Sequence, residues 1–124
     1  MAAWTSEELD KVSSADELHI APEKSDGSLR HPIPIWVVRD GDDLFVRAVN
    51  GPNSAWFRTA TRSRKGHIRA GGVDKDVEFS EVDPSLSSAI DADYRAKYQR
   101  YPKNIVDTIV SPGAREATLK LVPR

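Results

Sequence analysis

The sequence predicts a single α+β domain, mainly β, built as a six-stranded antiparallel barrel with short peripheral helices. Six apolar segments have strand length, and most of them are joined by short Gly-containing turns typical of hairpins. No βαβαβ alternation occurs, which excludes a doubly wound parallel sheet. The 124 residues match one ordinary domain, so we expect residues 1–124 to fold as one unit.

Composition excludes several function classes. The chain has no cysteine, which rules out disulfides, thiolate metal sites and cysteine nucleophiles. Its net charge of −1 argues against non-specific binding to nucleic acid or membranes, and no apolar run approaches the length of a membrane span. Glu7 and Glu8 follow soon after the first residue, unlike a signal peptide, so we expect a cytoplasmic protein.

The first elements are a helix and a strand. Thr5 and Glu8 have the spacing of a capping box, which predicts a helix over residues 5–13, and Trp4 has the position of a hydrophobic staple. Alternating apolar residues then predict a strand over residues 16–22.

A hairpin follows over residues 35–49. Its first strand is nearly continuously apolar, as expected of a buried strand, and an Asp-Gly turn leads into the second. Arg47 falls on a strand face between two apolar residues. Its side chain must therefore lie near an edge, reach water, or meet an anion.

Residues 54–63 read as a basic helix that Gly66 should end. Arg58, Arg62 and Lys65 form one stripe, which is either a solvated surface or part of an anion-binding face. Residues 44–73 contain no Asp or Glu and carry +6, so the rest of the chain sums to −7. This uneven charge favours an anionic ligand.

The remaining segments are a hairpin with one acidic face, two helices and a last strand, expected over residues 67–82, 83–101, 104–110 and 117–121. Pro112 and Gly113 should turn the chain before that strand. Tyr94, Tyr98 and Tyr101 recur at helical spacing, and we expect this stripe in the core or at a subunit interface.

No catalytic motif is present. The sequence lacks phosphate-binding glycine loops and the nucleophile elbow. Its three histidines lie on separate segments, so we expect no metal site. Any chemistry would come from a cofactor that the protein binds and orients.

Several segments together resemble a family of small bacterial proteins known only as a domain of unknown function (DUF2255): residues 27–30, 32–38, 40–46, 50–58, 68–73 and 89–98. More distantly, the first half is similar to split-barrel flavin-binding proteins, which include pyridoxamine-phosphate oxidase-like proteins and deazaflavin-dependent nitroreductases. The shared features are a Gly-x-x-Arg stretch ending at Arg30, an Asp-Gly hairpin, and a helix beginning at Ala55-Trp56-Phe57.

This resemblance implies a homodimer that binds FMN or F420 and a flavin- or deazaflavin-dependent oxidoreductase. Matched by position, four residues would line the cofactor site: Arg30, Asn50, Ser54 and Trp56. The charge pattern adds Arg47, Arg58 and Arg62, and the cofactor ring would pack near Trp36 or Trp56.

Two alternatives stay open. The chain could be a non-enzymatic module that binds a small anionic ligand and has lost the flavin. It could also be a purely structural interaction protein, in which case replacing Arg47 or Arg58 would change no ligand affinity.

Overall fold

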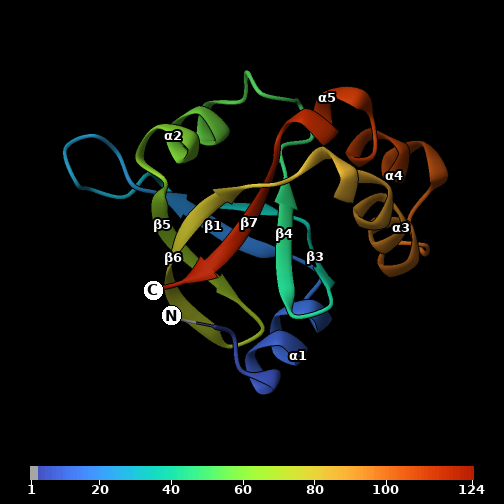
Figure 1. The fold of residues 1–124 in the computed structure, drawn as a ribbon, viewed down its shortest axis with the longest axis horizontal. Coiled ribbons are helices and arrows are strands. Elements are labelled where there is room, and N and C mark those ends of the chain that lie inside the picture. Colours follow the sequence, from blue (N-terminus) through green and yellow to red (C-terminus); the bar gives the residue numbers. More distant parts are fainter. Residues whose placement is uncertain (1–2) are drawn as a thin grey trace.

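A computed structural model describes residues 3–124 as a curled antiparallel sheet with helices around it (Figure 1). The class agrees with the sequence prediction. The elements in chain order are α1 (Ser6–Ser14), β1 (Leu18–Pro22), β2 (Ile33–Ile35), β3 (Val37–Asp40), β4 (Asp43–Arg47), α2 (Ala55–Ser63), β5 (Lys65–Ala70), β6 (Val73–Glu81), the 3-10 helix η1 (Pro84–Leu86), α3 (Ser87–Lys97), α4 (Lys103–Ile109), α5 (Pro112–Glu116) and β7 (Thr118–Pro123).

The sheet has seven strands in the order β2-β1-β5-β6-β7-β4-β3, one more than predicted. The extra strand arises because Trp36 interrupts the predicted strand and divides it between β2 and β3. β2 pairs with β1, whereas β3 pairs with β4. The two strands at the ends of the sheet are thus consecutive in the chain, and Trp36 joins them. This connection curls the sheet into a nearly closed barrel.

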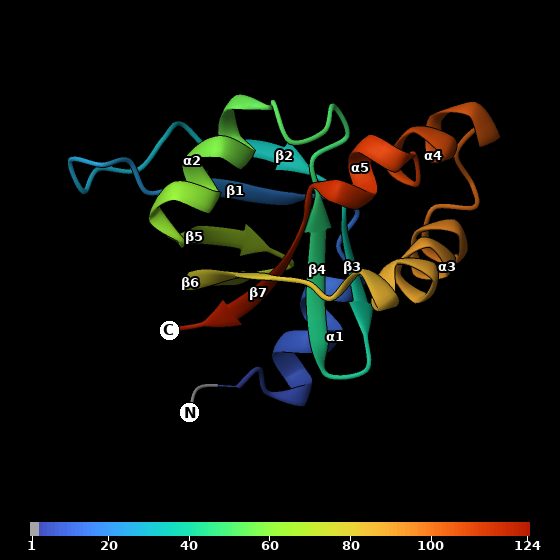
Figure 2. The ribbon, with the colours of Figure 1, turned by 45° about the horizontal axis from the view of Figure 1, so that its top comes forward.

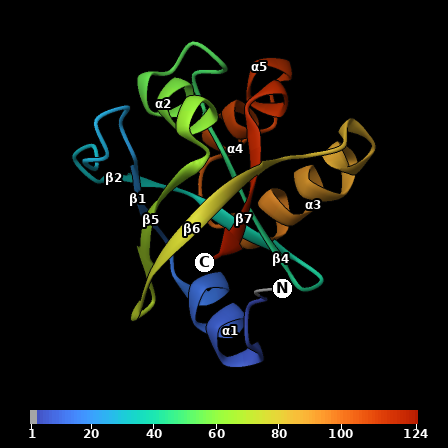
Figure 3. The same ribbon diagram turned by 60° about the vertical axis from the view of Figure 1, so that its left-hand side comes forward.

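The helices cover three parts of the barrel (Figure 3). α1 lies at one end and α2 at the other, while α3, α4 and α5 lie together on one side (Figures 2 and 3). The predicted capping box is present, since Thr5 Oγ1 accepts from Glu8 N–H and Glu8 Oε1 accepts from Thr5 N–H. Trp4 anchors this end by donating its indole N–H to the Leu121 carbonyl at 2.9 Å.

Apolar side chains form two cores. One fills the barrel, and the second lies between the barrel and the helices α3 and α4. Tyr94 and Tyr98 are fully buried in the second core, and Tyr101 packs against it. The tyrosine stripe is therefore a core feature of the single chain. Of the two positions expected for this stripe, the core and a subunit interface, the structure shows the core.

Local boundaries differ from the prediction in three places. α2 ends at Ser63 as predicted, but the residue that closes it is Arg64, in the left-handed conformation with φ 59°, and not Gly66. Gly66 instead lies in β5, where an added Cβ would come within 2.8 Å of the Ala21 carbonyl oxygen. The residues after Ser111 form α5 rather than a turn, because the Ser111 side chain caps them.

The predicted helix over residues 83–101 is two elements, η1 and α3, and the second ends at Lys97. Across residues 3–124, no helix combines the length and apolar character that crossing a membrane requires.

Candidate functional site

Two adjoining hollows lie between the barrel, α2 and α4, and they share a wall made by Pro34, Ile35, Val49 and Trp56. The polar hollow has a volume of about 510 Å³ and is also lined by Arg30, Ile33, Asn50, Asn53, Ser54 and Ala55. The apolar hollow has a volume of about 220 Å³ and is also lined by Glu17, Trp36, Arg47, Ile105, Thr108 and Ile109.

The polar hollow contains the first turn of α2. Ser54 is the N-cap residue, but its hydroxyl donates to the Gly51 carbonyl at 2.9 Å and makes no cap hydrogen bond. The first-turn N–H groups therefore receive no acceptor from this side chain. The turn also contains no acidic residue. First-turn N–H groups without a side-chain cap and the positive end of the helix dipole together favour an anion here.

Arg30 adds a positive charge to the same hollow. It follows β1 and lies across from α2, where its Nη1 donates to Thr59 Oγ1 at 3.4 Å. Among residues 3–124, no carboxylate lies within ion-pair distance of its guanidinium group. A partly buried cation held by one long hydrogen bond remains available to a ligand.

The apolar hollow has a rigid aromatic wall. Trp36 stacks on Tyr98 with ring centroids 3.9 Å apart and planes within 5°. The Tyr98 hydroxyl accepts from the Val37 N–H at 3.1 Å and donates to the Asp16 carbonyl at 2.9 Å. These bonds fix the tyrosine, and the tyrosine fixes the indole that faces the hollow.

Apolar side chains stand exposed at this hollow. Val49 is 47% exposed and Ile105 is 44% exposed, and they are two of the four large hydrophobic residues with this much exposure in residues 3–124. Because both line the same hollow, they form a local apolar surface that a ligand or a second chain could cover.

Arg47 also borders the apolar hollow, but its guanidinium group already has internal partners. It donates to Asp91 Oδ1 at 2.5 Å, Thr118 Oγ1 at 3.0 Å and the Ile109 carbonyl at 3.1 Å. Its side chain is 0% exposed. Of the three environments considered for Arg47, the structure shows an anion, and that anion is the protein's own Asp91.

Asp91 lies between two arginines. Burial alone would raise the pKa of its carboxyl group, but hydrogen bonds from Arg115 and Arg47 outweigh burial and hold the pKa below its ordinary value. The carboxylate therefore stays ionised. The Arg47–Asp91–Arg115 triad joins β4 to α3 and α5 and so holds the helices beside the apolar hollow.

The basic stripe lies elsewhere. Arg58 and Arg62 are exposed on α2 and line neither hollow. Residues 44–73, which contain no Asp or Glu, have less unpaired positive charge in the folded structure than their sequence suggests. Three of its six basic residues pair with acids from other segments, as Arg47–Asp91, Arg64–Glu81 and Arg69–Asp74.

Six of the eight candidate residues border the two hollows, namely Arg30, Trp36, Arg47, Asn50, Ser54 and Trp56. Sequence reasoning missed Glu17, Ile105 and Thr108 in the apolar hollow. Glu17 directly precedes β1, whereas Ile105 and Thr108 lie on α4. No spacing along the chain connects these two segments. In residues 3–124, no three His, Asp or Glu side chains are grouped to hold a metal ion.

Comparison with known proteins identifies a family. The family described as "Uncharacterized protein conserved in bacteria (DUF2255)" matches residues 8–121. No curated protein matches the chain by sequence.

Solved structures with a similar fold include three proteins of low sequence identity. A conserved hypothetical protein from Mycobacterium tuberculosis has a TM-score of 0.65 and 14% identity, over 99% of this chain and 82% of its own. A protein named F420 reductase has a TM-score of 0.57 and 14% identity, over 93% and 90%. A Mycobacterium smegmatis protein named for binding FAD and heme has a TM-score of 0.54 and 17% identity, over 95% of this chain and 65% of its own. At these identities the likeness establishes the split-barrel fold.

Proposed function

The chain belongs to the DUF2255 family of bacterial proteins, a membership that assigns no activity, and we propose from the geometry of its site that it binds FMN or F420. One observation carries this proposal. A cationic, N–H-rich hollow and an aromatic-walled apolar hollow meet at Trp56, so a single ligand with an anionic group and a flat ring could occupy both.

The phosphate of the cofactor would lie in the polar hollow. Arg30 supplies a guanidinium group without a carboxylate partner, and the first turn of α2 supplies N–H groups. Asn50 and Ser54 add short polar side chains beside them. This combination matches the chemistry of phosphate recognition.

The ring would lie in the apolar hollow against Trp36 and Trp56. Stacking on Tyr98 keeps Trp36 in a fixed orientation, and Ile105 and Val49 would exclude water from the ring. A bound flavin or deazaflavin would supply electron or hydride transfer, which makes a flavin- or deazaflavin-dependent oxidoreductase the activity we propose. The structural neighbours named for F420 and FAD support this choice at the level of the fold.

We also propose that two chains associate around this site. The supporting observation is the exposure of Val49 and Ile105 beside the apolar hollow, since an apolar surface of this kind is typical of a contact region. A two-fold dimer should bury at least ~1,000 Å² in total. Sedimentation that gives the mass of one chain at micromolar concentration would contradict it.

The experiment that tests the cofactor proposal is a titration of the purified protein with FMN and with F420, followed by tryptophan fluorescence and equilibrium dialysis. We expect quenching and saturable binding of at least one of them, because Trp36 and Trp56 border the ring hollow. Absence of binding for both at tens of micromolar would contradict the proposal. Thermal stabilisation by small phosphates or carboxylates alone would then favour the non-enzymatic module.

A further inference from the structure

Outside the candidate site, two carboxyl groups meet where α3 packs on β3. Asp93 lies on α3, and its carboxyl group is within hydrogen-bonding reach of the Asp40 carboxyl group at the end of β3. The Asp93 Oδ2 atom is buried and has no hydrogen-bond partner in the described part of the chain. Two ionised carboxylates this close would repel each other, whereas one shared proton lets them bond.

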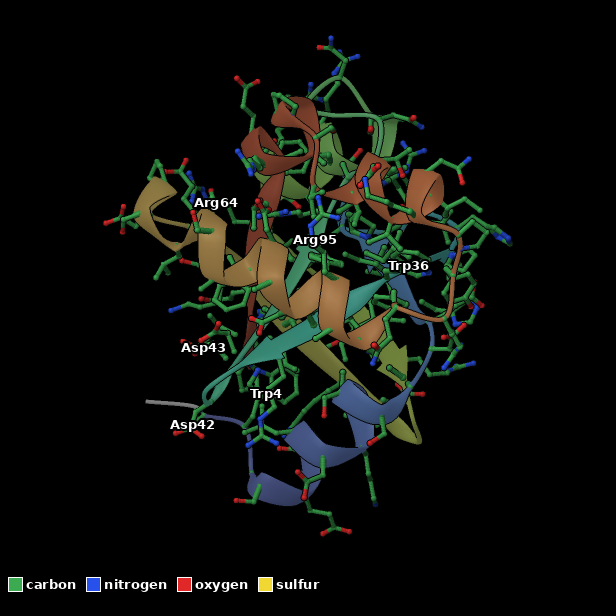
Figure 4. The ribbon with its side chains drawn as sticks, turned by 90° about the vertical axis from the view of Figure 1, so that its right-hand side faces the viewer. Trp4, Trp36, Asp42, Asp43, Arg64 and Arg95 are labelled. Carbon is green, nitrogen blue, oxygen red and sulfur yellow. The ribbon has the colours of Figure 1, made fainter. Side chains whose placement is uncertain are left out.

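We propose that Asp40 and Asp93 form a proton-sharing pair that docks α3 onto β3, and that losing the shared proton loosens this contact and the aromatic wall of the apolar hollow. Figure 4 looks onto α3 where it crosses the hairpin of β3 and β4, with Trp36 at the far end of β3 from Asp42 and Asp43. The proposal does not depend on which ligand the hollow binds.

The charged groups around the pair have other partners or are exposed. On β3, Arg39 donates to Asp10 and to the Gly41 carbonyl. On α3, Lys97 donates to the Val37 carbonyl at 2.7 Å. On α4, Asp107 binds Arg95 and Lys103.

The remaining acidic residues near these elements do not compete for a cation. At the hairpin tip, Asp42 and Asp43 are exposed, and on α3 Asp91 is held by Arg47 and Arg115. No cation among residues 3–124 pairs with Asp40 or Asp93.

The titration falls in the physiological range. Burial, together with the hydrogen bond to Asp40 and the charge repulsion from it, raises the pKa of Asp93 from 3.8 to about 7. An unfolded chain releases this proton near 3.8, so the folded protein loses stability as the pH rises from there to about 7, and the loss then levels off.

A contact along α3 connects the pair to the hollow. The same helix carries Tyr94, which is buried in the core between α3 and the barrel, and is followed directly by Tyr98, which stacks on Trp36. Loosening α3 against β3 would therefore change the environment of the Trp36 indole.

The test is an NMR titration of the wild-type protein from about pH 5 to about pH 9, which follows the Asp93 carboxyl carbon and the Trp36 indole N–H. We expect both signals to titrate with one midpoint. In the variant Asp93→Asn, whose amide can donate to Asp40 as the protonated acid does, the Trp36 titration should disappear. Its melting temperature should exceed that of the wild type more at pH 8 than at pH 5.

The matched control is Asp42→Asn, which removes an exposed carboxylate from the neighbouring turn and should leave the Trp36 titration intact. If Asp93→Asn does not fold, Asp40→Asn serves instead, and it should lower the Asp93 midpoint. A wild-type Trp36 signal that stays unchanged across this range, or a titration that persists in Asp93→Asn, would overturn the proposal.

Discussion

Arg47 and Arg30 have opposite surroundings, although both were expected to bind the same anion. Arg47 is buried on β4, and its guanidinium group is satisfied by Asp91, Thr118 and a backbone carbonyl. Arg30 lies at a hollow and makes one long hydrogen bond to Thr59. The first arginine maintains the fold, and the second remains available to a ligand. A positive charge in sequence therefore indicates a binding site only where the fold leaves that charge without an internal partner.

The largest effect should come from removing the satisfied arginine. Arg47→Met leaves Asp91 with one cationic partner in a buried position, and breaking a buried pair in this way costs about 3–5 kcal/mol of unfolding free energy. Urea denaturation measures the loss. The matched control is Arg58→Met, which removes the same group from an exposed position and should change stability by less than about 0.5 kcal/mol. Equal effects of the two substitutions would contradict the comparison.

A smaller loss should follow Arg115→Met. Arg115 binds Asp91 from the other side, but its side chain is 48% exposed, so water can replace part of the lost interaction. We expect about 1–3 kcal/mol by the same denaturation measurement. The two substitutions share Asp91, so the double variant should depart from the sum of the single effects. Strict additivity would show that the triad does not act as one unit.

The smallest effect should come from a cationic residue paired at the surface. His67 contacts Asp76 at 2.8 Å and also Asp74, and the hydrogen bond to Asp76 is the main reason that its pKa is raised. Its stabilising contribution is complete below the unfolded pKa of about 6.5 and is lost as the pH rises through the raised folded pKa.

His67→Gln should accordingly cost less than about 1 kcal/mol at low pH, and the difference in melting temperature from the wild type should shrink as the pH rises. Calorimetry between about pH 5 and about pH 9 measures this trend. A difference that grows with pH would contradict the assigned charge state.

Local sequence signals predicted most of the fold. The capping box at Thr5 and Glu8 and the Gly-containing hairpins depend on residues close together in the sequence, so the sequence alone predicts them. The break at Trp36 was missed because it depends on β2 pairing with β1 while β3 pairs with β4, and on stacking with Tyr98. The end of α2 at Ser63 was predicted, but Gly66 was wrongly expected to close the helix, because here a non-glycine residue, Arg64, takes the left-handed conformation.

The sequence predicted only part of the candidate site. Arg30, Asn50, Ser54 and Trp56 were selected by resemblance, and the fold brings them around one hollow. Glu17 and the α4 residues of the apolar hollow reach it through tertiary packing alone, which no spacing reveals. The partner of Arg47 lies 44 residues away on α3, so the charge pattern could not indicate that it was already neutralised.

The most direct test compares the affinities of wild type, Arg30→Gln and Arg62→Gln for FMN and F420. Each substitution removes one positive charge, but only Arg30 lines the polar hollow. Loss of a charge-assisted hydrogen bond should weaken binding of the phosphate-bearing ligand by roughly ten- to hundredfold in Arg30→Gln. Arg62→Gln should bind almost as the wild type does, and both variants should keep wild-type stability. Unchanged affinity in Arg30→Gln, or an equal loss in Arg62→Gln, would contradict the assignment of the polar hollow as the anion site.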